Sequence, residues 1–132
     1  MGAAAAVVAQ VFRGTVQVAT SMAPTPPQRV VTVARQFAAG LRERFGERLL
    51  EVRLFGSHAR AEGRPDSDVD LFVLLDVASR ADRSAVTDLA GDLWRETELR
   101  LSPTIMERDR HAHWLAQERP LVMEIAREGL VL

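Results

Sequence analysis

The sequence predicts an α/β (α+β) fold in which a small mixed β-sheet is flanked by helices, and three observations support this. Apolar residues recur at helical spacing between Val30 and Phe45, and again between Val86 and Trp94. Residues 69–77 are almost continuously apolar, which is typical of a central strand covered on both faces. The resulting order of helix, strand, turn, strand, helix, strand and helix predicts one layered domain.

The first helix is expected to begin with a capping box, in which Thr25 is the N-cap and Gln28 reaches back to it across two prolines. Gly46 is expected to end this helix. The residues predicted to form its buried stripe are Val30, Ala34, Phe37, Leu41 and Phe45.

The following segments alternate between strands and helices. The predicted buried faces are Leu50, Val52 and Leu54 of a first strand, and Val86, Leu89, Ala90, Leu93 and Trp94 of a second helix. A third strand over Leu99–Ile105 contains Pro103, which favours the edge of the sheet. Two short helices are expected over 107–117 and 119–128, followed by a stop at Gly129 and a C-terminal tail.

Composition limits the classes of function. The chain has 132 residues, is 47% hydrophobic and 27% charged, and carries a formal net charge of -1. This balance gives no strong signal for nucleic-acid or membrane-surface binding. No apolar run approaches the ~20 residues of a membrane span. Cysteine is absent from the sequence, so thiolate metal sites are excluded and a reducing, cytoplasmic location is expected.

The N-terminal residues differ in composition from the rest. Residues 1–24 are rich in alanine and valine and run into a proline-rich segment, and we interpret them as a flexible extension. The domain is expected to occupy 25–132. Met22 is an alternative start, in which case 1–21 would not belong to the native protein.

The segment 54–75 carries the chemistry. Gly56-Ser57 follows a predicted strand, and such a turn offers backbone N–H groups and a hydroxyl to phosphate. After a gap of ten residues, Asp68 lies just before the apolar strand and Asp70 lies within it. Because side chains alternate along a strand, both carboxylates lie on one face, suited to one divalent cation. An ionised Asp70 within this apolar run is costly unless a cation or hydrogen-bond donors compensate it.

These residues resemble the Gly-Ser-x10-Asp-x-Asp signature of the polymerase-beta-like nucleotidyltransferase superfamily, and in particular its minimal nucleotidyltransferases. Ala59-Arg60 and Ser67-Asp68 also match the family pattern around the signature. The motif match covers 54–75, and the order of elements agrees over about 25–132.

The resemblance implies a role for each motif residue. It makes Asp68 and Asp70 catalytic ligands of Mg²⁺, which bridges the phosphates of ATP or another nucleoside triphosphate. Gly56, Ser57, Arg60 and Ser67 are then the nucleotide-binding residues. Arg60 either contacts a phosphate or pairs with Asp66 or Asp68, and the sequence leaves both alternatives open.

The resemblance also implies a third carboxylate. Active relatives place one more acid on the next strand, as a metal ligand or general base. In this chain that strand is expected over 98–103, where Glu98 is the only acid, and Glu98 is either the catalytic base or a solvated residue at a helix end. If Arg100 occupies the position of the acid in active relatives, we expect the site to bind nucleotide but to catalyse the transfer poorly.

Three functions follow from the resemblance. The first is a Mg²⁺-dependent nucleotidyltransferase that moves AMP from ATP to a partner protein, as the antitoxin of a helical HEPN-type toxin. The second is a nucleotide-binding module that neutralises such a partner by contact. The third is a small-molecule (antibiotic) nucleotidyltransferase, which we expect to need a second helical domain. A homodimer is also compatible with the sequence.

Overall fold

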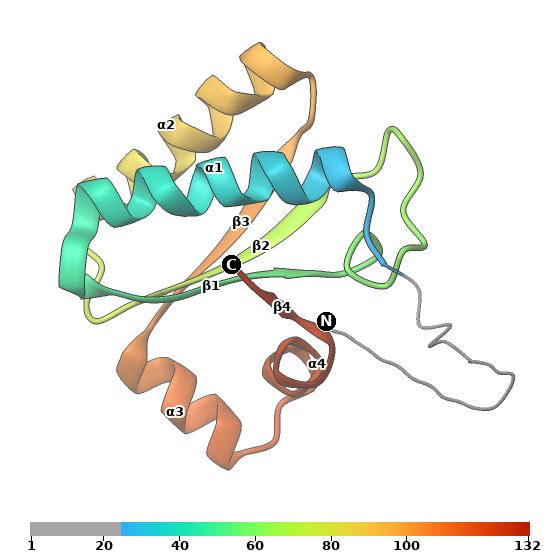
Figure 1. The fold of residues 1–132 in the computed structure, drawn as a ribbon. Coiled ribbons are helices and arrows are strands. Elements are labelled where there is room, and N and C mark those ends of the chain that lie inside the picture. The colour runs from blue at the N-terminus through green and yellow to red at the C-terminus, as the bar shows by residue number, and fades with distance from the viewer. Residues whose placement is uncertain (1–24) are drawn as a thin grey trace, which may run out of the picture.

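The computed structural model describes residues 25–132, and these form a four-stranded sheet with two helices on each face (Figure 1). The expected extension 1–24 and the alternative start at Met22 lie outside the described residues. Across 25–132, every helix is too short or too polar to cross a lipid bilayer. In chain order the elements are α1 (Gln28–Phe45), the 3-10 helix η1 (Gly46–Arg48), β1 (Leu49–Phe55), β2 (Val69–Leu75), α2 (Arg80–Thr97), β3 (Leu101–Glu107), α3 (Arg108–Ala116), α4 (Pro120–Glu128) and β4 (Leu130–Val131).

The sheet is mixed, as predicted. Its strand order is β3-β2-β1-β4. β1 runs antiparallel to both β2 and β4, whereas β2 and β3 are parallel and are joined through α2. β3 is therefore an edge strand, which explains why it tolerates Pro103, a residue without a backbone N–H.

β2 is covered on both faces, as its apolar run predicts. Its odd-numbered residues, from Val69 to Leu75, pack into the core under α1 and α2. Phe72 and Leu74 point to the other face and join a second core under α3 and α4. Because side chains alternate along a strand, Asp70 belongs to the α3/α4 face.

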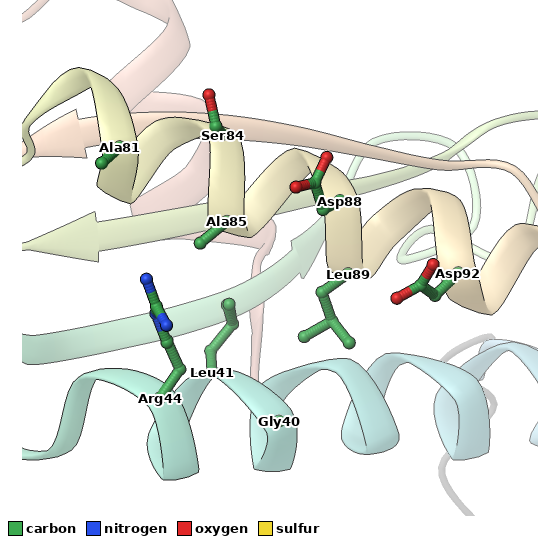
Figure 2. A pocket seen from close by; sticks show the side chains of 9 residues that line it. All are labelled: Gly40, Leu41, Arg44, Ala81, Ser84, Ala85, Asp88, Leu89 and Asp92. Atoms are coloured by element: carbon green, nitrogen blue, oxygen red, sulfur yellow. The ribbon is translucent and has the colours of Figure 1, made fainter.

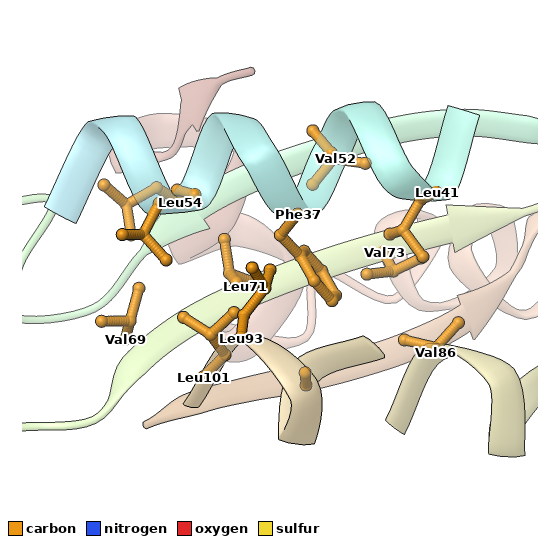
Figure 3. Packing of buried hydrophobic residues seen from close by; sticks show 14 of the residues in the cluster. Phe37, Leu41, Val52, Leu54, Val69, Leu71, Val73, Val86, Leu93 and Leu101 are labelled. Carbon is orange, nitrogen blue, oxygen red and sulfur yellow. The ribbon is translucent and has the colours of Figure 1, made fainter. Parts of the chain in front are cut away.

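The larger core lies between the sheet and the helix pair α1 and α2 (Figure 3). Figure 3 shows Phe37 of α1 pointing toward the sheet among the side chains of β1, β2 and α2. The predicted stripe of α1 is confirmed, since all five of its residues are buried. Gly46 ends α1 with a positive φ of 58°.

The start of α1 differs from the prediction. Pro27, not Thr25, is the N-cap, and no side chain caps the helix. Gln28 is therefore the first helical residue rather than the third, so it cannot close a capping box. The box forms instead in α2, where the Ser79 hydroxyl accepts a hydrogen bond from the N–H of Asp82 at 3.1 Å and the Asp82 carboxylate accepts one from the N–H of Ser79 at 3.0 Å.

Three further details were not anticipated. Leu50 is 41% exposed because the β1–β2 register shifts between Leu49 and Glu51, which moves Leu50 off the buried face. Trp94 is 45% exposed rather than part of the core. The C-terminal tail forms β4, in which Leu130 pairs with β1.

We predict that Phe37→Ala destabilises the domain by about 3–5 kcal/mol, because this fully buried ring fills the centre of the larger core. Leu50→Ala is the control and should change stability by less than about 0.5 kcal/mol, since Leu50 is largely exposed. Urea unfolding of both variants measures the difference. Equal losses for the two variants would contradict the assignment of the core.

Candidate functional site

The turn at Gly56 packs directly against the carboxylate of Asp70. Gly56 follows β1, whose last residue Phe55 pairs with Asp70 on β2. The backbone of Gly56 has a φ of +78°, which favours glycine. A Cβ at this position would overlap Asp70 Oδ2 and lie 3.1 Å from its Cγ. Both the backbone conformation and the available space therefore require glycine here.

The loop after Gly56 has the hydrogen bonding of a single helical turn. The N–H of Arg60 donates to Gly56 O at 3.2 Å, and the N–H of Glu62 donates to Ser57 O at 2.8 Å. The segment 57–61 consists of turns rather than a regular helix. The N–H groups that precede these donors hold the sequence positions of the first N–H groups of a helix, which can bind an anion. The half-buried Ser57 lies at this end of the loop.

Asp68 and Asp70 interact electrostatically. Asp70 is half-buried on the α3/α4 face of β2, and Asp68, whose side chain is 46% exposed, lies just before the strand. Burial raises the pKa of Asp70, and the negative charge of Asp68 raises it further. A pair of carboxylates that repel each other at a strand end fits one divalent cation, which prefers oxygen ligands. Within 25–132, no group of three or more acidic, histidine or cysteine side chains is placed to hold a metal.

Arg60 pairs with residues other than those expected. Its guanidinium lies 3.0 Å from Glu62, 3.2 Å from Glu128 and 3.7 Å from Glu124. The predicted partners Asp66 and Asp68 are not among its ion pairs. Hydrogen bonds to Glu62 and Glu128 raise the pKa of Arg60 above its ordinary value. Arg60 therefore ties the loop to α4, a role that the sequence did not reveal because Glu124 and Glu128 lie far away in the chain.

His58 is buried in the loop between the glycine turn and the aspartates. The imidazole is only 2% exposed, and its Nε2 lies 3.2 Å from the carbonyl oxygen of Ser67. Gly63 lies so close that a Cβ there would be 2.8 Å from His58 Cγ. Ser67 is also engaged locally, since its hydroxyl accepts a hydrogen bond from the N–H of Arg64 at 2.9 Å. His58 thus links the glycine turn to the residue preceding Asp68.

Glu98 lies at the end of a helix, which is one of the two interpretations that the sequence left open. It is the exposed C-cap of α2, with a left-handed φ of 63°, and β3 begins three residues later. The parallel register places Ser102 of β3 beside Asp70. Arg100 lies just before β3, with its Nε 3.8 Å from Asp68 Oδ1. Asp70 therefore has Ser102 of β3 as its neighbour, and Asp68 has Arg100 just before β3.

A cavity of about 480 Å³ opens elsewhere, between α1 and α2 (Figure 2). Figure 2 shows Gly40 and Arg44 of α1 opposite Leu89 and Asp88 of α2. A Cβ at Gly40 would lie 2.8 Å from Leu89 Cδ2, so glycine allows the two helices to approach closely. These helices cover the face of the sheet opposite to Asp70, and the cavity is not part of the carboxylate site.

We predict that Gly56→Ala disrupts the site for two reasons. The added methyl group would overlap the Asp70 carboxylate, and alanine would be strained at the positive φ of this residue. The expected loss of stability is about 1–3 kcal/mol, measured by thermal unfolding. Gly46→Ala is the matched control, since it has a similar φ but nothing within 4 Å of its Cβ. If both variants lose the same stability, backbone strain alone accounts for the effect and the contact with Asp70 contributes nothing.

We predict that Asp70→Asn raises the melting temperature of the metal-free protein at pH 7. The raised pKa of Asp70 means that the folded state binds its proton more tightly than the unfolded state does. This favourable contribution is present at acidic pH and is lost as the pH rises through the folded-state pKa, so the ionised carboxylate is a cost at neutral pH. The advantage of the variant should disappear in acid. Melting curves between pH 3 and pH 8 measure it, and Asp66→Asn in the exposed turn is the control.

Comparison with known proteins agrees with this geometry. A family model described as a nucleotidyltransferase domain matches residues 34–121, more than half of the chain. A comparison with curated proteins finds no match.

Several solved structures share the fold. A candidate minimal nucleotidyltransferase is 27% identical over 78% of this chain and 95% of its own, with a TM-score of 0.51. A toxin–antitoxin complex with AMP-PNP is 18% identical over 73% of this chain and 69% of the other, with a TM-score of 0.50. A tri-AMPylated HEPN toxin of Shewanella oneidensis in complex with its MNT antitoxin matches at 16% identity over 77% and 70%, with a TM-score of 0.46. The family match, together with the glycine turn against the paired aspartates, shows that the chain belongs to the nucleotidyltransferase domain family, as a minimal domain of the polymerase-beta-like type.

Proposed function

We propose that the protein transfers a nucleoside monophosphate, AMP from ATP, to a partner protein and so acts as the antitoxin of a HEPN-type toxin. The observation that carries this proposal is the contact between the Gly56 turn and Asp70, with Asp68 beside it. This arrangement brings an anion-binding turn next to a carboxylate pair suited to a divalent cation. A nucleoside triphosphate with Mg²⁺ needs both features at once.

In the proposed reaction, a hydroxyl oxygen of the acceptor forms a bond to the α-phosphorus of ATP. The bond from that phosphorus to pyrophosphate breaks, and the hydroxyl proton passes to a base. The Ser57 hydroxyl and the N–H groups of the glycine turn hold the phosphates. Asp68 and Asp70 would hold Mg²⁺, which when bound neutralises phosphate charge.

The other predicted residues take supporting roles in this proposal. Ser67 and Arg60 act on the nucleotide through the loop that they hold, because the Ser67 hydroxyl bonds to Arg64 and Arg60 is tied to α4. Glu98 as the catalytic base stays a prediction. Its position at the end of α2 requires that an acceptor place its hydroxyl there.

The exposure of the site favours a macromolecular acceptor. Asp68 and Arg100 are both about half exposed, so a protein surface can approach the carboxylate pair without entering a cleft. The toxin–antitoxin complex with AMP-PNP supports an antitoxin role and an adenine nucleotide. The absence of cysteine suits the reducing cytoplasm, where ATP and Mg²⁺ are abundant.

A second function, neutralisation of the partner by contact alone, is favoured by one observation. Among the described residues, no third acid joins Asp68 and Asp70 in a metal-binding group, and Glu98 caps a helix instead. Such a protein would bind nucleotide and partner without transferring AMP. The two functions differ in whether the partner gains mass.

We predict that the purified protein transfers label from α-labelled ATP to a discrete protein band in a lysate of the source cells, and that this requires Mg²⁺. The variant Asp68→Ala/Asp70→Ala should lose at least about 100-fold of this activity, because it lacks both proposed metal ligands. Asp66→Ala is the matched control from the same loop and should retain activity.

The position of the label separates the alternatives. This chain contains no tyrosine, so any AMP-tyrosine must belong to the partner. Glu98→Gln should lower the rate if Glu98 is the base and leave it unchanged otherwise. Binding of AMP-PNP and partner without transfer would favour neutralisation by contact, and failure to bind nucleotide at all would refute the proposed function.

A further inference from the structure

We propose that Arg100 takes the place of a third carboxylate, so that the site binds its nucleoside triphosphate with one divalent cation and one fixed guanidinium instead of two cations. This inference rests on the proposed function, since it assumes that Asp68 and Asp70 bind a metal. It goes further by assigning the metal stoichiometry and a phosphate-binding residue.

The strand register places Arg100 in this position. β2 and β3 are parallel, with Val69 beside Leu101 and Asp70 beside Ser102. The backbone pairing continues to Arg100, whose carbonyl oxygen accepts a hydrogen bond from the N–H of Val69 at 2.8 Å. Ser102 of β3 and Arg100 just before it therefore occupy the two positions next to the aspartates, where a third acid would have to lie to share a cation with them.

The guanidinium of Arg100 is held beside Asp68, and two contacts define its place. Its Nε lies 3.8 Å from Asp68 Oδ1, and its Cζ lies 4.6 Å from the ring centroid of Trp94. Stacking on an aromatic ring restrains a guanidinium while leaving its edge N–H groups free for another partner. Trp94 is 45% exposed, so its ring is open to this contact.

Charge decides the number of cations. Asp68, Asp70 and Arg100 together carry a charge of -1, whereas three carboxylates would carry -3. Arginine has no lone pair to offer a metal and stays protonated, so it cannot act as a third ligand. Its N–H groups instead match the oxygens of a phosphate. The guanidinium therefore offsets part of the phosphate charge without a second metal ion.

The first test counts bound metal. Mn²⁺ titration of the full chain in the presence of AMP-PNP, followed by electron paramagnetic resonance, should give one Mn²⁺ per chain. Two Mn²⁺ ions in the wild type would overturn the inference while leaving the proposed function intact. No bound Mn²⁺ would refute the metal site itself and this inference with it.

Restoring an acid should restore the second ion. In Ser102→Asp the new carboxylate lies beside Asp70, and the count should rise to two Mn²⁺ per chain. Arg100→Asp is a second variant for the same measurement in case Ser102→Asp does not fold, as judged by circular dichroism. A count of one in folded forms of both variants would overturn the inference.

The affinity for nucleotide supplies an independent readout. Arg100→Ala should weaken AMP-PNP binding by about tenfold or more, since a charged hydrogen bond to phosphate is lost, and Arg100→Lys should recover part of it. The control Arg95→Ala removes another exposed arginine of this region, one that pairs with Asp92, and should leave the affinity unchanged. Equal affinity in Arg100→Ala and the wild type would contradict the role of Arg100.

Discussion

The burial of β2 on both faces is the constraint on which the rest of the molecule depends. Because one face of this strand packs under α1 and α2 and the other under α3 and α4, its register cannot slip by one residue without exposing two cores. This fixed register places Asp70 on the α3/α4 face at the start of the strand. It also sets Phe55 of β1 and Ser102 of β3 on either side of Asp70.

The glycine turn and its loop are held by several independent contacts around this carboxylate. Gly56 packs against Asp70, His58 binds the carbonyl oxygen of Ser67, and Arg60 is tied to acids of α4. Each contact joins the loop to a different part of the fold. A loop restrained in this way presents its N–H groups in one arrangement, which is what binding a flexible triphosphate requires.

Two arginines near the site, Arg60 and Arg100, differ in how many carboxylates they pair with. Arg60 belongs to the family motif, but three carboxylates surround it and offset its charge. Arg100 is outside the motif, yet it makes a single, longer ion pair and stacks on Trp94. The guanidinium that lies beside Asp68 therefore comes from the residue just before β3.

The sequence by itself determined the fold class, the helical stripe around Phe37, the central strand β2 and the family motif, because periodicity and motif spacing are local properties. It offered both a strand position and a helix end for Glu98 and could not decide between them, since the boundary between α2 and β3 depends on how α2 packs. It also could not pair Arg60 with Glu128, which lies 68 residues away. Only the tertiary structure brought Arg100 beside Asp68, because strand register is set by both buried faces of β2 together.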